Sequence, residues 1–286
     1  MHKPENSLQK FLMSLTNFSK SRFRGLSVLF LLSVGLTAGS SLKAQAETPQ
    51  SAPPQLKDTL TQIDTAANSR NVQSVMQFYS PNFRNSDGLT RASMEQALTQ
   101  LWKRYPQLNY RTELQNWKNE GNAIVAETVT KITGNQGTSD MRIKLESTLR
   151  SRQRFEGQKI VQQDILAERT QLTSGANPPS VQINLPDQVR TGQQFNFDVI
   201  VKEPVGDSVL LGTAIEEPIK PERYIKPANL KLDVLPAGGI FKVGKAPLKE
   251  DNRWLSAVLI REGGMIMITQ RVQVVNRLSP TTGTSK

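Results

Sequence analysis

The sequence contains no cysteine, and its one histidine is His2. Without cysteine, the chain forms no disulfide, has no disulfide-linked partner and offers no thiol for lipid attachment. Beyond His2 the chain has neither histidine nor cysteine. This excludes nucleophilic catalysis by a serine–histidine or cysteine–histidine pair in that part of the chain, and most kinds of zinc and copper site. We therefore expect no metal site and no cofactor, and each domain must be held together by its packed core.

A long apolar run is also missing. The apolar stretch Leu26–Leu36 is shorter than the ~20 residues that a membrane-spanning helix needs. Basic residues precede this stretch, and Ala44-Gln45-Ala46 follows it, which is the order of a secretory signal peptide. We expect cleavage after Ala46 and export, to the periplasm or, in a photosynthetic source, to the thylakoid lumen. The alternative is a retained membrane anchor.

The net charge of +11 overstates how basic the exported chain is. The expected signal peptide, residues 1–46, carries six Lys or Arg residues and one Glu, which leaves +6 for the rest. The basic residues are not clustered with interleaved aromatic residues, so we do not expect a nucleic-acid partner.

Helical periodicity dominates the sequence that follows the polar, proline-rich segment 47–55. Apolar residues recur every three or four positions in Leu56–Asn68, and again in the stretch after Asn71 and in the stretch after Thr90. Asn71 and Thr90 are suitable N-caps for the second and third helices. Pro81 ends the second pattern at a corner.

From Leu108 the period changes to two, which predicts β-strands joined by short turns. The expected strands are Leu108–Trp117, Ala123–Thr133, Met141–Phe155 and Lys159–Leu172. One face of the third strand is apolar, and the other carries a row of basic residues that we call the basic strip: Arg142, Lys144, Arg150, Arg152 and Arg154. The strip could contact an anionic partner, or it could form cross-strand ion pairs on a solvated face.

The small residues and prolines of segment 174–180 predict a linker. Beyond it, short strands with frequent turns indicate an all-β sandwich over 181–276, followed by a disordered tail, 277–286. The expected strands are Val181–Leu185, Phe195–Lys202, Val209–Ile215, Leu230–Leu235, Ile240–Val243, Trp254–Arg261 and Met265–Val275. The opening Pro178–Val201 resembles the first two strands of bacterial immunoglobulin-like domains.

The first half, residues 56–173, resembles the nuclear transport factor 2-like superfamily, which includes ketosteroid isomerases and polyketide cyclases. The resemblance rests on the corner Phe78-Tyr79-Ser80-Pro81-Asn82-Phe83, with helices on both sides and a strand meander after them. It implies an α+β cone in which three helices pack on a curved antiparallel sheet. The expected fold is thus this cone followed by an immunoglobulin-like β-sandwich in an exported bacterial protein.

The fold that this resemblance implies hosts both enzymes and binding modules, so function must be argued from the site. No catalytic residues can be assigned by motif. The polar residues that we expect to line a cone cavity are Asp64, Tyr79, Tyr110 and Glu127. The leading hypothesis is a non-catalytic binding or assembly module that contacts another envelope protein or an anionic surface. The alternative is a small-molecule isomerase or dehydratase with carboxylate–tyrosine acid–base chemistry. The sequence does not indicate the oligomeric state.

Overall fold

The computed structural model describes residues 46–137, 142–204, 209–226, 229–235 and 238–277. The expected signal peptide therefore lies, apart from Ala46, outside the described residues, as does all but Arg277 of the predicted tail. Within the described ranges, no helix combines the length and the apolar character needed to cross a membrane.

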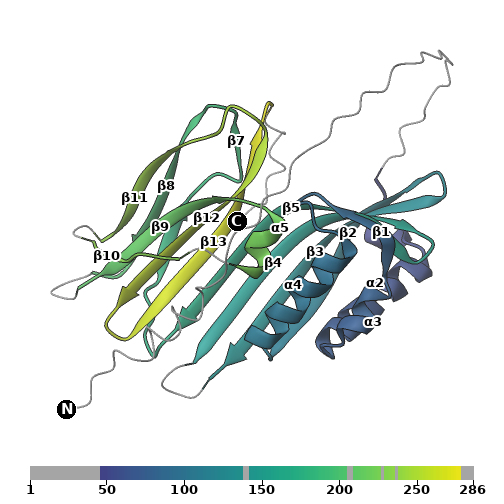
Figure 1. Ribbon diagram of the computed structural model, residues 1–286, viewed down its shortest axis with the longest axis horizontal. Coiled ribbons are helices and arrows are strands. Elements are labelled where there is room, and N and C mark those ends of the chain that lie inside the picture. Colours follow the sequence, from purple (N-terminus) through teal and green to yellow (C-terminus); the bar gives the residue numbers. More distant parts are fainter. Residues whose placement is uncertain (1–45, 138–141, 205–208, 227–228, 236–237, 278–286) are drawn as a thin grey trace, which may run out of the picture.

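Helices cover one face of a large, curved sheet (Figure 1). They are α2 (Pro54–Asn68), α3 (Val72–Met76) and α4 (Arg91–Arg104), preceded by the short 3-10 helix η1 (Pro49–Ser51). Both predicted N-caps are confirmed: the Asn71 side chain accepts a hydrogen bond from the Ser74 N–H, and Thr90 forms a reciprocal capping box with Ser93. Local sequence signals therefore set where these helices begin.

The corner after α3 contains a strand that the sequence pattern did not predict. β1 (Tyr79–Asn85) runs parallel to β5 (Lys159–Ser174), and its register is irregular between Tyr79 and Arg84. This irregular stretch contains Pro81, which has no N–H to donate to a ladder. The proline therefore ends the helical pattern, as expected, but the chain continues as an interrupted strand.

The predicted meander is confirmed, and it continues into the second half of the chain. Its strands are β2 (Leu108–Glu120), β3 (Ala123–Gln136), β4 (Ile143–Glu156) and β5. The next strand across from β5 is β13 (Gly264–Val275), followed by β12 (Asp251–Arg261), β9 (Leu211–Pro218) and β10 (Asp233–Val234). One sheet thus runs through both halves, across the predicted linker.

In the second half, a smaller sheet packs against the β9, β12 and β13 part of the large sheet. It contains β11 (Gly239–Lys245), β8 (Gln194–Val201) and β6 (Val181–Asn184), in that order. The core between the two sheets takes alternate residues from each, including Phe195 and Phe197 of β8 and Leu255 and Leu259 of β12. The described part is therefore mostly antiparallel sheet with few helices, compatible with a cone and a β domain. The immunoglobulin-like assignment stays a prediction.

Two further short elements were not predicted from the sequence. β7 (Gln188–Arg190) pairs in parallel with β13, and α5 (Pro221–Ile225) contacts α4 of the first half. The predicted strand Leu230–Leu235 is reduced to the two residues of β10.

Glycine allows a close approach where the two halves join. A Cβ atom at Gly264, the first residue of β13, would lie 2.5 Å from the carbonyl oxygen of Ser174, the last residue of β5. Such a contact is shorter than real Cβ atoms make, so a larger residue would push the two strands apart.

Candidate functional site

A cavity of about 320 Å³ lies between helices α2 and α4 and the inner face of β2–β5. Most of its lining is apolar, with contributions from Leu60, Met94, Leu101 and Ile132. The polar and aromatic residues that line it are Asp64, Tyr79, Asn85, Trp102, Tyr110, Thr112, Thr130, Ser147, Gln153, Gln163, Glu168, Thr170 and Tyr224. Its volume falls at the lower end of the range of small-molecule sites, ~300–1,000 Å³.

Asp64, an expected cavity residue, does line the cavity, but its carboxylate holds the neighbouring edge strand. The backbone N–H and the hydroxyl of Thr112 both donate to this carboxylate, at 2.6 Å each. On the same edge, the amide of Asn68 accepts from the N–H of Tyr110 at 2.7 Å and donates to its carbonyl at 3.0 Å. Helix α2 thus satisfies backbone groups of β2 that would otherwise be open to pairing with another chain.

Tyr79 and Tyr110 also lie at the cavity, as expected. Desolvation by burial raises the pKa of Tyr79 to about 12, and the neighbouring Tyr110 adds to the shift. Burial likewise raises the pKa of Tyr110 to about 12, although a hydrogen bond from Trp102 and the charge of Arg70 oppose it. The Trp102 indole N–H donates to the Tyr110 hydroxyl at 2.8 Å. Both tyrosines therefore present protonated hydroxyl groups at neutral pH.

Three carboxamide residues lie side by side at the cavity on β1, β5 and β4. Asn85 on β1 lies opposite Gln163 on β5, and Gln163 lies opposite Gln153 on β4, so the three residues form a row across neighbouring strands. The side-chain Oδ1 of Asn85 accepts from the N–H of Asp87 at 2.8 Å, which fixes the orientation of the amide so that Nδ2 is a donor. Within the described chain, Asn85 Nδ2 and Gln153 Oε1 are buried without a hydrogen-bond partner. Buried polar atoms without partners are uncommon and point to a missing water or ligand.

Glu168 faces the cavity because of a β-bulge. The pairing of β4 with β5 moves from Arg150–Ala167 to Ser151–Ile165, so that Leu166 is left without an opposite residue. One extra residue reverses which side chains point inward. Simple alternation along β5 would instead place Glu168 on the outer face of the sheet, which is the face of the basic strip.

An ion cluster joins Glu168 to the second half of the chain. The Arg271 guanidinium on β13 donates to both carboxylate oxygens of Asp87, at 2.8 and 2.7 Å, and to Glu168 Oε2 at 3.1 Å. The Tyr224 hydroxyl on α5 donates to Asp87, and the Trp254 indole N–H donates to Glu168 at 2.9 Å. The side chains of Arg271 and Asp87 are fully buried. The two halves therefore meet at an ion pair, Arg271 with Asp87, whose side chains are shielded from water.

The electrostatic environment of this cluster keeps both the guanidinium and the phenol protonated. Burial alone lowers the pKa of Arg271, but hydrogen bonding to Asp87 and the carboxylate charges outweigh it and raise the value. Burial, followed by the charges of Glu168 and Asp87, raises the pKa of Tyr224 far above its usual range.

The turn that carries Asp87 continues into Gly88, whose φ of 83° favours glycine.

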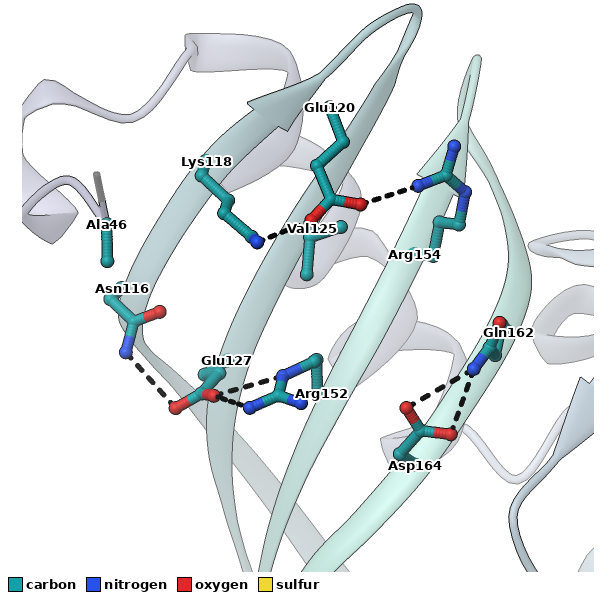
Figure 2. A pocket seen from close by; sticks show the side chains of 10 residues that line it. All are labelled: Ala46, Asn116, Lys118, Glu120, Val125, Glu127, Arg152, Arg154, Gln162 and Asp164. Atoms are coloured by element: carbon teal, nitrogen blue, oxygen red, sulfur yellow. Dashed lines mark hydrogen bonds and ion pairs between the residues drawn. The ribbon is translucent and has the colours of Figure 1, made fainter. Parts of the chain in front are cut away.

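The structure places Glu127 on the outer face of the sheet, which corrects its assignment to the cavity. It lies in a shallow pocket of about 480 Å³ together with Arg152 and Arg154 of the basic strip (Figure 2). Arg152 donates to Glu127 at 2.7 and 3.1 Å, and Asn116 donates at 3.2 Å. Partial burial raises the pKa of Glu127, but these hydrogen bonds and the Arg152 charge outweigh it and hold the pKa below its usual range.

The rest of the basic strip also lies on the outer face, half-buried at Arg154 and otherwise exposed, and it is largely paired. Arg150 contacts Glu127 at 3.4 Å, Arg154 contacts Glu120 at 2.9 Å, and Lys144 contacts Glu146 at 2.7 Å. Arg142 is exposed and lies immediately before β4. The strip thus has the cross-strand ion pairs of a solvated sheet face.

Sequence reasoning brought together Asp64, Tyr79 and Tyr110 but missed the carboxamide row and the ion cluster. A signal for Arg271 is present in the sequence, since a lone arginine interrupts a strand that is otherwise neutral from Gly264 to Val275. Among the described residues, no group of three or more metal-ligating side chains is close enough to hold an ion.

A family model described as a domain of unknown function (DUF8623) matches residues 176–275, which end with the last residue of β13. Curated proteins gave no match to the chain.

Similar solved structures include Bd1075 of Bdellovibrio bacteriovorus, with 12% identity over 38% of this chain and 39% of that chain, at a TM-score of 0.28. A putative SnoaL-like polyketide cyclase from Shewanella putrefaciens matches with 11% identity over 40% of this chain and 90% of that one, at a TM-score of 0.30. A nuclear transport factor 2-like protein from Cytophaga hutchinsonii matches with 12% identity over 40% of this chain and 91% of that one, at a TM-score of 0.25. The similar structures thus include nuclear transport factor 2-like and polyketide cyclase-like folds.

Proposed function

We propose that the protein is a non-catalytic binding module whose cone cavity takes a small, mostly apolar molecule. The observation that carries this proposal is the cavity of about 320 Å³. Its lining is mostly apolar, but two buried polar atoms of its lining residues have no hydrogen-bond partner in the described chain. At about 30 Å³ per water molecule, the space corresponds to about ten waters or a ligand with about ten non-hydrogen atoms.

The polar groups at the cavity define how a ligand would be oriented. Asn85 Nδ2 offers a hydrogen-bond donor and Gln153 Oε1 an acceptor, and neither has a partner in the described chain. The protonated hydroxyl groups of Tyr79 and Tyr110 are further donors. A few placed polar groups in an apolar pocket are typical of sites that bind small molecules.

The alternative of an isomerase or dehydratase requires a carboxylate that is free to take a proton from a substrate. Asp64 is already engaged by two hydrogen bonds from Thr112. Glu168 accepts from Arg271 and Trp254 through one of its oxygens. Asp64 is thus engaged at both oxygens, and of these two carboxylates only Glu168 keeps an oxygen, Oε1, without a donor among the described residues, so the geometry supports binding more directly than carboxylate–tyrosine acid–base catalysis.

The basic strip supports a partner contact less well than the cavity supports a ligand. Its arginines are paired with Glu127 and Glu120, which reduces the positive charge available to an anionic surface. Contact with another envelope protein or an anionic surface stays a prediction, as does export.

The proposal is tested by calorimetry with 2-phenylethanol, a neutral probe of about nine non-hydrogen atoms. At about 0.5 kcal/mol per atom, between the known bounds of ligand efficiency, we expect a Kd of about 1 mM. Ala97→Phe, which places a ring in the cavity from α4, should abolish binding. Ala92→Phe makes the same change at an exposed position of the same helix and should leave binding unchanged. Equal binding by both variants would contradict the proposed site.

A further inference from the structure

The charged groups that line the cavity all have the same sign. Asp64 and Glu168 are both lining residues, and no lysine, arginine or histidine of the described chain lines the cavity. Beside it, the single guanidinium of Arg271 faces the two carboxylates of Asp87 and Glu168. When ionised, this cluster retains one uncompensated negative charge. A buried charge without compensation is costly, so a positive group in the cavity would be stabilised there.

The free hydrogen-bonding capacity at Glu168 points in the same direction. Arg271 and Trp254 both donate to Oε2, while Oε1 accepts no hydrogen bond from the described residues. The Glu168 side chain is 18% exposed and lines the cavity, in contrast to the fully buried Arg271. One carboxylate oxygen is therefore available to a donor on a ligand.

A second observation, independent of the acidic residues, also calls for a donor. Gln153 is 8% exposed and lines the cavity, and its Oε1 has no hydrogen-bond partner in the described chain. In the register of β4 and β5, Gln153 lies four residues from Leu149, the residue opposite Glu168, which is about 13 Å along the strand. An ammonium group is a donor without acceptor capacity, which suits a carboxylate oxygen such as Glu168 Oε1, and a further donor on the ligand would suit Gln153 Oε1.

The apolar lining also contains aromatic rings suited to a cation. Tyr79, Trp102, Tyr110 and Tyr224 contribute to the cavity wall. A cation over the face of an aromatic ring gains about 0.5–2 kcal/mol, with the larger values at sites shielded from water. An anionic ligand would find donors in Asn85 Nδ2 and the tyrosine hydroxyls, but it would also meet two carboxylates, with no lysine, arginine or histidine side chain of the described chain in the lining to offset their charge.

We infer that the cavity selects a small organic cation, a protonated amine with an apolar body, over neutral and anionic molecules of the same shape. This inference rests on the proposed binding function and specifies its ligand class. The ammonium group lies towards Glu168, and the apolar body lies towards the side chains of α2 and α4.

The test compares three probes that share one apolar body: 2-phenylethylammonium, 2-phenylethanol and phenylacetate, each titrated into the full chain by calorimetry. We expect the ammonium to bind about tenfold tighter than the alcohol and the carboxylate to bind more weakly than both. Glu168→Gln should remove most of the preference for the ammonium over the alcohol. Glu146→Gln makes the same substitution at an exposed ion pair on the outer face and should leave the preference unchanged.

A second measurement, by nuclear magnetic resonance, uses the unmodified chain and so does not depend on whether the Glu168→Gln variant folds. The Trp254 indole N–H donates to Glu168, and its nuclear magnetic resonance signal should move further with the ammonium than with the alcohol. If the alcohol binds as tightly as the ammonium, or if phenylacetate binds most tightly, the cation inference is wrong while the binding function stands. If none of the three probes binds, the binding function and the inference both fail.

Discussion

Replacing Arg271 by methionine tests how strongly the ion cluster joins the two halves. The arginine and Asp87 have fully buried side chains and two hydrogen bonds of 2.8 and 2.7 Å between them. Arg271→Met removes the cation but leaves the Asp87 carboxylate buried without it. Breaking a buried ion pair in this way costs ~3–5 kcal/mol, a large part of a typical unfolding free energy of ~5–15 kcal/mol.

The free energy of unfolding is measured by urea denaturation, followed by tryptophan fluorescence and by circular dichroism. The matched control is Arg152→Met, because Arg152 is 48% exposed and pairs with Glu127 on the outer face. Loss of such an exposed pair should cost at most about 1 kcal/mol. Adding Asp87→Asn to Arg271→Met removes both charges, and the double variant should lose less than the sum of the single losses. The reasoning is refuted if Arg271→Met costs no more than Arg152→Met.

Three further predictions follow from the edge strand, the tyrosines and the leader. Asp64→Ala leaves the Thr112 N–H without its acceptor and should lower the free energy of unfolding, measured by urea denaturation, by ~1–3 kcal/mol. Asp58→Ala, at an exposed position of the same helix, should change it by no more than ~0.5 kcal/mol. Equal losses would show that Asp64 does not stabilise the edge strand β2. Burial raises the pKa of each of the four tyrosines, to about 12 for Tyr79 and Tyr110, so absorbance at alkaline pH should show the phenols of the folded protein titrating at higher pH than those of the unfolded chain. The pKa values of Tyr79 and Tyr110 are about 12 in the folded protein, against 10 in the unfolded chain, so the folded state binds more protons between pH ~10 and pH ~12. The contribution of the two tyrosines to the free energy of unfolding is therefore complete below pH ~10 and is lost as the pH rises towards ~12. Intact-mass measurement of the protein from its native source should give Glu47 as the first residue, and a mass that includes residues before Ala44 would favour a retained anchor.

Local patterns in the sequence predicted most of the secondary structure. The N-caps Asn71 and Thr90 and the alternation in β2–β5 depend on neighbouring residues, so they can be read directly from the chain. β1 was missed because its pairing with β5 is parallel and interrupted near Pro81, which leaves little regular alternation.

The functional residues were harder to predict because their positions depend on distant partners. Glu168 faces the cavity only because Leu166 is accommodated in a bulge, and sequence alternation alone cannot locate that bulge. Arg271 and Asp87 are 184 residues apart, so neither position reveals the other. Glu127 was placed in the cavity for its residue type, but strand parity puts it beside Arg152 on the outer face.

The predicted linker, residues 174–180, separates two sequence patterns but does not interrupt the sheet. β13 pairs with β5 from Met265 opposite Ser174 to Gln270 opposite Arg169. This ladder and the Arg271 cluster both cross the proposed boundary. Either half expressed alone would expose a sheet edge and leave charged groups without their partners, so we expect both to be less stable than the full chain.

The most direct test of the central claim, that the cone cavity holds a ligand, is the indole N–H spectrum of the full chain titrated with 2-phenylethanol. The sequence has three tryptophans. Trp102 lines the cavity, whereas the Trp117 indole N–H donates to the Thr48 carbonyl at 3.1 Å, at the edge of the sheet. We predict that the Trp102 signal moves in a saturable way while the Trp117 signal stays in place. An unmoved Trp102 signal, or equal movement of both signals, would contradict the claim.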